Sequence, residues 1–480
     1  MCSVTTRPFC VPHAHPEPLL PRKPCGSPQA GGSFKVRDFA ISESPAVQAQ
    51  LDRLGALSLP QGRLHLDTAR ALLARLGNPE RRLPPVLHVA GTNGKGSTCA
   101  FLRAICEAQG LTVHAATKPH LVRYNERIRI AGKLIEDSYL AVLLEEVLDA
   151  GKDSAASFFE VTTVATFLAF SRLPADLCVI ETGLGGRLDA TNVIPMPAVC
   201  GISSLGIDHE SFLLSPEDGV PTEPLARIAF EKASIAKRGV PLVTQAYPAL
   251  AADEVLETAA RIGAPVTMRG RDWWADVSTE GISYRDAAGG LTLPCPALIG
   301  AHQADNAALA VAMLRHQSAL AISPEAMAEG IRSARWPARL QVLGPGPLTD
   351  RLPGRTVIVD GGHNADAAQA VARALGNRAP IDLVFGLTRA RKIADVLFPI
   401  APLVRKAHTV PLPGHDHHDP RDIAAVAQSK ASPRHCYPAF SLDEAIERLS
   451  SDPEGARTIL IAGSLYLAGE ALRMNAELPA

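Results

Sequence analysis

The sequence predicts an α/β protein with mostly parallel sheets in two folded domains. Short apolar runs alternate with helical stretches along the chain, and a strand, a glycine-rich turn and a helix follow one another over residues 86–108. A second series of strands and helices begins after the Gly-Pro-Gly-Pro stretch at 344–347. Strands that alternate with helices form parallel sheets covered by helices. A chain of 480 residues is long enough for two such domains.

The order of the elements gives the predicted domain boundaries. Residues 1–42 are rich in proline and glycine and predict a flexible tail. The helical pattern starts at Ser44 and Pro45, and a further helix is predicted over 66–76. Strands are predicted at 86–90, 177–181, 199–203 and 240–244 in a first domain, residues 43–338, and at 357–360, 383–386 and 458–462 in a second, residues 339–480.

The composition is that of an ordinary globular protein. It is 46% hydrophobic and 20% charged, and its formal net charge is -1. Nucleic acids and acidic membrane surfaces need clustered positive charge, so neither is an expected partner. No apolar run reaches the roughly 18 residues of a membrane helix, and we expect a cytoplasmic protein. The nine cysteines form no CxxC pair, and Cys178 and Cys200 lie in apolar runs that predict reduced core residues.

The most informative motif is HVAGTNGKGS at 88–97, a glycine-rich turn between a predicted strand and helix. Glycines let backbone N–H groups approach phosphate oxygens, and a helix N-terminus adds positive potential. Lys95 supplies a positive charge and the Ser97 hydroxyl can face Mg²⁺. The spacing differs from GxxxxGK[ST], because a glycine separates the lysine from the serine. The alternative is a glycine-rich turn that binds nothing.

A second group of polar residues follows two other predicted strands. The run VIETGLGGRLDATN at 179–192 places Glu181 where a buried strand ends, and the carboxyl ends of parallel strands are where ligands bind. Magnesium takes one or two carboxylates and keeps waters and phosphate oxygens, so Glu181 is a candidate ligand. His209, in IDHE at 207–210, could reach the same ion. Taken alone, a glutamate such as Glu181 is more often a surface or ion-paired residue.

Three weaker patterns have competing interpretations. Lys232 lies among apolar neighbours on a predicted helix, where it is either a buried lysine that needs compensation or a lysine that snorkels to solvent, and this motif alone favours the second. The run HDHHD at 415–419 has metal-binding residue types but lies in a proline-flanked loop, which favours a solvated loop. Trp273 and Trp274 belong to no motif, and packing is the preferred interpretation.

Ten segments in order resemble the folylpolyglutamate synthase and dihydrofolate synthase family, relatives of the Mur ligases. They are HVAGTNGKGS, PHLVRYNERIRIAG from Pro119, SFFEVTT from Ser157, ETGLGGRLDATN, LGIDH, EKASIAK, HQADNA from His302, WPARLQ from Trp336, DGGHN from Asp360 and GSLYLAGE from Gly463. The match runs from about residue 46 to 472, and ten ordered segments are more specific than any one of them.

The resemblance implies a P-loop ATPase domain followed by a smaller Rossmann-like domain, with ATP and Mg²⁺ as cofactors. It also implies which residues bind ATP, which bind the metal and which bind the acceptor. The phosphates of ATP would be held by Thr92, Asn93, Gly94, Lys95, Gly96 and Ser97, and the nucleotide would also meet Asn306, Arg339, Asp360 and His363. Glu181 and His209 match Mg²⁺ ligands, and Lys232 matches a lysine that carries a carbamate. Ser157, Phe159, Asp189 and Ala190 match positions that line the pterin or folate site.

Three positions depart from the family pattern. Lys118 stands where the family usually has a serine that can contact Mg²⁺, and an ammonium cannot ligate a metal. The motif DGAHNP reads Asp-Gly-Gly-His-Asn-Ala at 360–365, and EKAGI reads Glu-Lys-Ala-Ser-Ile at 231–235. These last two changes keep Asp360, His363 and Lys232.

The function implied by the resemblance is ATP-dependent ligation of L-glutamate to dihydropteroate and to reduced folates through an acyl phosphate. The partners would be these small molecules, and family members are commonly monomeric. Two alternatives are a Mur-type ligase that acts on another acceptor and a nucleotide-binding homologue that has lost catalysis. The glycine between Lys95 and Ser97 argues against the first, and the retained Glu181, His209 and Lys232 argue against the second.

Overall fold

The computed structural model describes residues 41–57, 65–429 and 435–479. The tail predicted at 1–42 therefore lies almost entirely outside the described residues. Val36–Ala480 form one compact unit, which is described below.

The larger sheet has eight strands in the order β4-β3-β2-β5-β1-β6-β7-β8. β3 runs antiparallel to β2 and β4, and every other pair in this sheet is parallel. The strands are β1 (Val86–Ala90), β2 (Val113–Ala116), β3 (Ile128–Ile130), β4 (Lys133–Leu134), β5 (Leu177–Glu181), β6 (Val199–Ile202), β7 (Leu242–Thr244) and β8 (Val266–Met268). The prediction of a mostly parallel sheet is confirmed.

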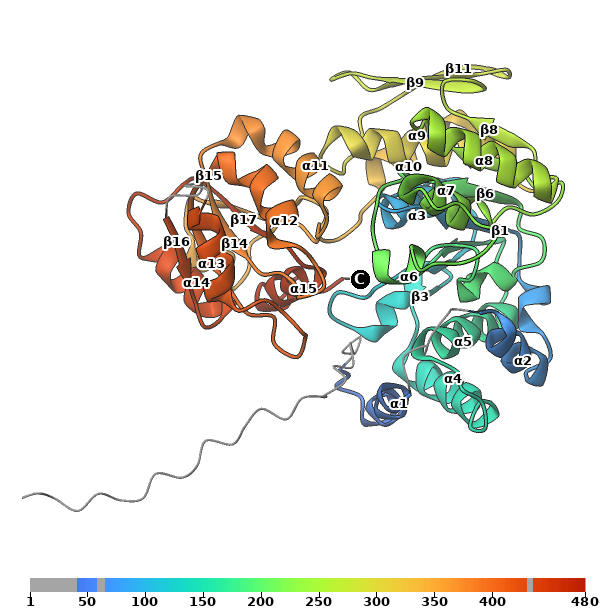
Figure 1. The fold of residues 1–480 in the computed structure, drawn as a ribbon, viewed down its shortest axis with the longest axis horizontal. Coiled ribbons are helices and arrows are strands. Elements are labelled where there is room, and N and C mark those ends of the chain that lie inside the picture. Colours follow the sequence, from blue (N-terminus) through green and yellow to red (C-terminus); the bar gives the residue numbers. More distant parts are fainter. Residues whose placement is uncertain (1–40, 58–64, 430–434, 480) are drawn as a thin grey trace, which may run out of the picture. The chain divides into compact units, whose positions relative to one another are not determined.

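Helices cover both faces of this sheet (Figure 1), as the alternation of side chains along β1 requires. Leu87 and Val89 pack with α3 (Lys95–Ala108), α9 (Ala301–His316) and α10 (Pro324–Ser333). Val86 points to the opposite core, which is built from α1 (Pro45–Ala56), α2 (Asp67–Arg75), α4 (Asp137–Ala150) and α5 (Phe158–Arg172). Further along the sheet, α7 (Pro224–Ala233) and α8 (Ala249–Ile262) pack with β6 and β7. Cys178 and Cys200 are buried and free, as predicted.

A three-stranded antiparallel sheet was not predicted from the sequence. It consists of β9 (Trp273–Val277), β10 (Ile282–Asp286) and β11 (Gly289–Leu293). Trp273 is fully buried and stacks on Tyr284 with ring centroids 5.8 Å apart, while the guanidinium of Arg285 lies 4.6 Å from the ring centroid of Trp274. The packing interpretation of the tryptophan pair is confirmed.

A six-stranded sheet in the order β12-β13-β17-β14-β15-β16 follows. Its strands are β12 (Gln341–Val342), β13 (Thr356–Val359), β14 (Ile381–Phe385), β15 (Val404–Thr409), β16 (His435–Pro438) and β17 (Thr458–Ala462). Only the β12–β13 pair is antiparallel among these described strands. One face packs against α11 (Ala365–Leu375), α12 (Ile393–Ile400) and α13 (Pro420–Ser429), and the other against α14 (Leu442–Ser450) and α15 (Leu465–Met474).

Candidate active site

The glycine-rich loop connects the carboxyl end of β1 to the N-terminus of α3. Gly94 is the N-cap of α3, and its φ of 85° is a conformation that favours glycine. A Cβ atom on Gly94 would also lie 2.3 Å from the Asn306 side-chain oxygen, so a larger residue does not fit. The first N–H groups of α3 have no acceptor within the helix and carry partial positive charge. The loop therefore presents the donors that a phosphate needs.

The side chains of the loop hold it in place. The Lys95 ammonium donates to the carbonyl oxygens of Gly91 (3.0 Å) and Thr92 (3.2 Å). The Thr92 hydroxyl donates to the Gly206 carbonyl oxygen at 2.8 Å and accepts from the Gly206 N–H at 3.0 Å. The structure thus fixes the lysine over the loop and ties the loop to the segment after β6.

Gly96, which makes this loop a variant of the common pattern, has a steric explanation. A Cβ atom at this position would lie 2.7 Å from Cζ2 and 2.8 Å from Cε2 of Trp336. The indole of Trp336 therefore packs against the first turn of α3 where only glycine leaves room. The sequence alone could not relate these two positions, which are far apart in the chain.

A Gly96→Ala substitution is expected to destabilise the protein by about 1–3 kcal/mol, because the added methyl group must displace the Trp336 ring. Urea unfolding monitored by circular dichroism measures this change. Gly55→Ala is the matched control, since Gly55 lies in α1 and, apart from its chain neighbours and the backbone of its own helix, nothing lies within 4 Å of the added Cβ. That control should be neutral or stabilising by up to about 1 kcal/mol. Equal stability of both variants and the parent protein would contradict the packing argument.

Glu181 lies at the carboxyl end of β5, directly beside β1 in the sheet, where Val89 is its register partner. It is buried, and one carboxylate oxygen accepts the backbone N–H of Lys118 at 3.0 Å. Burial raises the pKa of Glu181, while the nearby Lys95 ammonium and this N–H act in the opposite direction. The surface interpretation of Glu181 is therefore wrong, and within the described chain it forms no ion pair of 4.0 Å or less.

His209 precedes the short helix α6 (Glu210–Leu213) and has a left-handed backbone, with φ of 53°. Burial lowers its pKa to about 4; Asp208 opposes this shift, and Arg391 and Lys95 add to it. The imidazole is therefore neutral at physiological pH, which is the form that ligates metals.

The predicted metal ligands have donor types that a Mg²⁺ ion accepts. Ser97 is buried in the first turn of α3, and no hydrogen bond of its hydroxyl is found within the described ranges. Glu181 uses one oxygen for the Lys118 N–H, which leaves the other for an ion. No group of three or more His, Cys, Asp or Glu side chains suited to a metal occurs among the described residues. A set of one hydroxyl, one carboxylate and one imidazole suits an ion that takes its other ligands from phosphate and water.

Lys232 lies on α7 and is only 4% exposed. The interpretation as a snorkelling lysine is therefore wrong. Burial, followed by the charge of Lys95, lowers the pKa of Lys232 to about 7. In the part of the chain that the structure describes, its amine has no hydrogen-bond or ion-pair partner. A buried amine with this pKa is largely neutral at pH 8 and is nucleophilic.

The pKa of Lys232 predicts how stability depends on pH. The unfolded chain keeps this proton up to about pH 10.5, whereas the folded protein loses it above about pH 7. Between these values the unfolded state binds more protons, so this residue makes stability rise with pH, and its full penalty remains below pH 7. In CO₂-free buffer, Lys232→Met should be more stable than the parent at pH 7 by on the order of 1–3 kcal/mol, and the difference should shrink toward pH 10.

Urea unfolding between pH 6.5 and 9.5 measures this difference. The control is Lys152→Met, which removes an exposed lysine and should give no pH-dependent change. A difference for Lys232→Met that stays constant with pH would contradict the lowered pKa.

The residues predicted for the acceptor site lie at the start of α5 and in the loop that follows β5. They differ in how far their side chains are exposed and hydrogen-bonded. Ser157 is the N-cap of α5; its hydroxyl donates to Glu160 at 2.7 Å and accepts from the Glu160 N–H at 3.4 Å. Phe159 is 41% exposed and can stack on a flat ring. Asp189 is buried and caps the turn that begins at Ala190, which is half-buried. Ser157 and Asp189 thus shape these loops through local hydrogen bonds.

The carboxylate of Asp189 is held by its own loop. One oxygen accepts the N–H groups of Gly183 (2.9 Å) and Leu184 (2.8 Å), and the other accepts the N–H (3.0 Å) and hydroxyl (2.6 Å) of Thr191. Burial acts to raise the pKa of Asp189, but Lys118 and these hydrogen bonds outweigh it and lower the pKa. Asp189 is therefore ionised at neutral pH.

The residues predicted on the nucleotide side lie around the start of the six-stranded sheet. Asp360 follows β13, and its carboxylate accepts the N–H groups of Leu340 (2.8 Å) and Gly362 (2.7 Å). Arg339 donates to the Ala338 carbonyl oxygen at 2.9 Å. Burial, then Arg391, lowers the pKa of His363 to about 4. Asp360 therefore holds the loop on which His363 lies.

One polar network was missed by sequence reasoning. Asn93 and Asn364 exchange two amide hydrogen bonds, at 3.2 Å and 3.0 Å, and Asn364 also donates to Asp208 at 3.1 Å. Arg391 forms an ion pair with Asp208. Burial acts to raise the pKa of Asp208, yet His209 and Arg391 hold it well below its usual range. The signal was present, since Asp208 and Asn364 lie inside recognised motifs, but Arg391 belongs to none.

Comparison with known proteins identifies the family. Residues 338–465 match the family described as Mur ligase, glutamate ligase domain. The dihydrofolate synthase/folylpolyglutamate synthase of Escherichia coli (strain K12) is 32% identical over 410 residues, which cover 84% of this chain and 89% of that protein. This chain belongs to the dihydrofolate synthase/folylpolyglutamate synthase family.

Solved structures of this family agree with the fold. Escherichia coli FolC in complex with DHPP and ADP has a TM-score of 0.78 and 29% identity, covering 89% of this chain and 97% of that chain. A bifunctional folylpolyglutamate synthase/dihydrofolate synthase from Yersinia pestis, complexed with AMPPNP and Mn ion, has a TM-score of 0.76 and 27% identity, with coverage of 89% and 97%. Members of the dihydrofolate synthase/folylpolyglutamate synthase family with this fold thus bind adenine nucleotides and, in the second case, a divalent metal.

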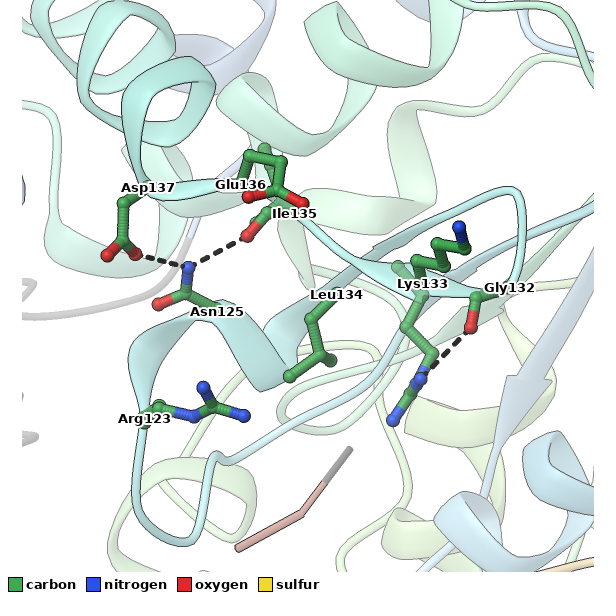
Figure 2. Close-up of a pocket in the computed structure, with 9 residues that line it drawn as sticks. Arg123, Asn125, Gly132, Lys133, Leu134, Ile135, Glu136 and Asp137 are labelled. Atoms are coloured by element: carbon green, nitrogen blue, oxygen red, sulfur yellow. Dashed lines mark hydrogen bonds between the residues drawn. The ribbon is translucent and has the colours of Figure 1, made fainter.

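Two further features lie outside the site of this dihydrofolate synthase/folylpolyglutamate synthase family member. A pocket of about 420 Å³ lies beside β3 and β4. Asn125, one of the residues that line it, donates to the Ile135 carbonyl oxygen and to Asp137, each at 2.8 Å. Figure 2 shows these residues around the pocket. None of the predicted site residues lines it. In the 415–419 loop, His415 stacks on Tyr466 and His418 hydrogen-bonds to the Arg391 carbonyl oxygen at 2.7 Å.

Among the described helices, none is long and apolar enough to cross a membrane.

Proposed function

We propose that this protein ligates L-glutamate to dihydropteroate, giving dihydrofolate, and to reduced folates that already carry glutamate, with ATP as the source of energy. The observation that carries the proposal is the meeting of a phosphate-binding loop and a buried carboxylate on adjacent strands, β1 and β5, in a chain of the dihydrofolate synthase/folylpolyglutamate synthase family. This is the edge of a parallel sheet where ligands bind.

The reaction needs an activated carboxylate, because an amine does not displace oxide from a carboxylate. A carboxylate oxygen of the acceptor attacks the γ-phosphorus of ATP, the bond from that phosphorus to ADP breaks, and an acyl phosphate forms. The neutral amine of glutamate then attacks the acyl carbon. The tetrahedral species collapses with loss of phosphate, and the amine nitrogen loses a proton to leave an amide.

The phosphate-binding loop stabilises the charge that moves in the first step. Lys95 and the N–H groups at the start of α3 are fixed before the reaction, so they stabilise charge on the transferring phosphoryl oxygens without reorganising. Ser97, Glu181 and His209 would hold Mg²⁺, which neutralises charge on the phosphates when it is bound. Glu181 also fixes the peptide of Lys118 beside this site.

Lys232 would act as a carbamate. Its neutral amine adds to carbon dioxide and releases a proton, which converts a buried cation into an anion that can help to position the metal. The pKa of about 7 and the lack of a partner within the described residues both support this role. The carbamate role is inferred from the family resemblance. The burial of Lys232 on α7 gives a physical reason for it, because a carbamate removes a buried positive charge.

Two groups of residues would bind the acceptor and the nucleotide. Phe159 would stack on the pterin, with Ser157, Asp189 and Ala190 shaping the surrounding loops. Asn306, Arg339, Asp360 and His363 would contact the nucleotide together with Thr92, Asn93, Gly94, Lys95 and Gly96.

The proposed domains are residues 43–338, which carry the ATP-binding loop, and 339–480, a Rossmann-like glutamate ligase domain. Their contact would exclude water from the acyl phosphate, which hydrolysis would otherwise consume. The Asn93–Asn364 hydrogen bonds are the kind of contact that would couple them. We further propose a monomer that works in the cytoplasm on small molecules alone, because one chain supplies every residue of the proposed site. Light scattering on the purified protein tests the monomer.

The function is tested by phosphate release with Mg-ATP and L-glutamate, with dihydropteroate and a reduced folate monoglutamate as alternative acceptors. Turnover with both is expected. Turnover with one only would restrict the protein to a dihydrofolate synthase or a folylpolyglutamate synthase. Turnover with neither would overturn the proposal in favour of another acceptor or a homologue without catalysis.

A further inference from the structure

The ammonium of Lys118 occupies a position that the proposed function has not used. Lys118 follows β2, and its side chain reaches toward α5, where Nζ donates to the Thr163 hydroxyl at 3.2 Å. Lys118 is half-buried, and the carboxylate of Asp189 lies on the same side of Gly183 as its side chain. A charge in such a place needs compensation.

Direct compensation is incomplete. An ammonium has three N–H donors, and in the described parts of the chain the Thr163 hydroxyl is the one hydrogen-bond partner of Lys118 Nζ. Asp189 lies nearby, but each of its oxygens already accepts two hydrogen bonds from its own loop. No ion pair of 4.0 Å or less joins Lys118 to a described carboxylate. Donors of the ammonium thus remain for an anionic ligand.

The surroundings show where this ammonium points. A Cβ atom on Gly183 would lie 3.5 Å from Lys118 Cδ, 3.8 Å from Lys118 Nζ and 3.1 Å from an Asp189 oxygen. The side chain of Lys118 therefore crosses the backbone just beyond Glu181, where β5 ends. The backbone N–H of Lys118 thus contacts the proposed metal ligand Glu181, and its side chain extends to the proposed acceptor loop at Asp189. Lys118 therefore joins the two parts of the proposed site that an acceptor carboxylate has to reach for phosphoryl transfer.

We propose that the Lys118 ammonium binds the carboxylate of the acceptor and holds it for phosphoryl transfer. This inference rests on the proposed function and adds a specific residue to it. The ligand is a carboxylate on a pterin-linked aromatic acid or on a folate. The ammonium gives two unused N–H donors to that anion, and the attraction is strengthened because the side chain is partly buried.

The test compares two ligands that differ only in the carboxylate. Dihydropteroate and the corresponding anilinomethyl dihydropterin, which lacks the carboxylate, are titrated by calorimetry in metal-free buffer, so that no ion supplies the charge. Lys118→Met should weaken the binding of dihydropteroate by about 10–100-fold and leave the affinity for the other ligand unchanged. Lys152→Met, an exposed lysine elsewhere on the chain, should change neither. Equal weakening of both ligands, or of neither, would overturn the proposal.

Two measurements keep this test separate from folding and from the proposed function. The parent protein alone should bind dihydropteroate at least about tenfold more tightly than the ligand without a carboxylate, and equal affinities would overturn the inference whether or not the variant folds. Phosphate release by the parent reports on the proposed function. A parent that ligates dihydropteroate while Lys118→Met keeps full affinity refutes the role of Lys118 only, whereas a parent without turnover on any acceptor refutes the function.

Discussion

Replacing Lys95 with alanine is expected to lower kcat for ligation by about 10³-fold, because one fixed donor to a developing anion contributes about 10²–10³ and this one also carries a full charge. The substitution also removes the hydrogen bonds from Nζ to Gly91 and Thr92, so the loop loses part of its support. The measurement is single-turnover formation of ADP and of the ligated product, with saturating acceptor and glutamate.

The thermal unfolding temperature of the same variant shows whether activity is lost through catalysis or through misfolding. Lys95 is half-buried and lies where the loop meets the start of α3 rather than in the core, so losing its two hydrogen bonds should lower the thermal unfolding temperature only slightly. Lys152→Ala is the matched control and should keep full activity. Near-normal turnover of Lys95→Ala would exclude phosphoryl transfer at this loop.

Replacing Lys232 with arginine should lower ligation by about 10–100-fold, the usual effect of losing a group that positions a metal ligand. Arginine keeps a positive charge but cannot form the carbamate, because its guanidinium stays protonated. The parent protein, with its Lys232 pKa of about 7, should show a carbamate signal in ¹³C NMR after incubation with labelled bicarbonate at pH 8. The variant should not show that signal.

A Lys232→Glu variant provides the charge control. Its carboxylate places an anion on α7 without a reaction with carbon dioxide, so it should retain more activity than the arginine variant. Lys237 lies beyond the end of α7 and already donates to the Asn192 side-chain oxygen at 2.7 Å, so Lys237→Arg should not affect the carbamate signal. An arginine variant as active as the parent, with no carbamate signal in either protein, would contradict the proposed role.

Local sequence patterns were sufficient to predict the limits of several buried strands. β1, β5 and β17 have the predicted limits, because each is a short, fully buried apolar run between turn residues. β7 begins two residues later than predicted, since Val240 and Pro241 lie before its first ladder residue. The β9–β11 sheet was missed because its strands expose part of one face and give no continuous apolar run.

The sequence by itself determined the glycine-rich loop between β1 and α3, the two series of parallel strands and the family, because these depend on residue types at fixed local spacing. Only the tertiary structure decided which side chains are buried and what they meet. It explains Gly96 by the ring of Trp336, places Lys232 in the interior rather than at the surface, and brings Arg391 to Asp208. It also leaves the Lys118 ammonium beside Asp189 with donors unused. Burial and long-range contacts set charge states and steric limits, and neither is encoded in the spacing of one segment.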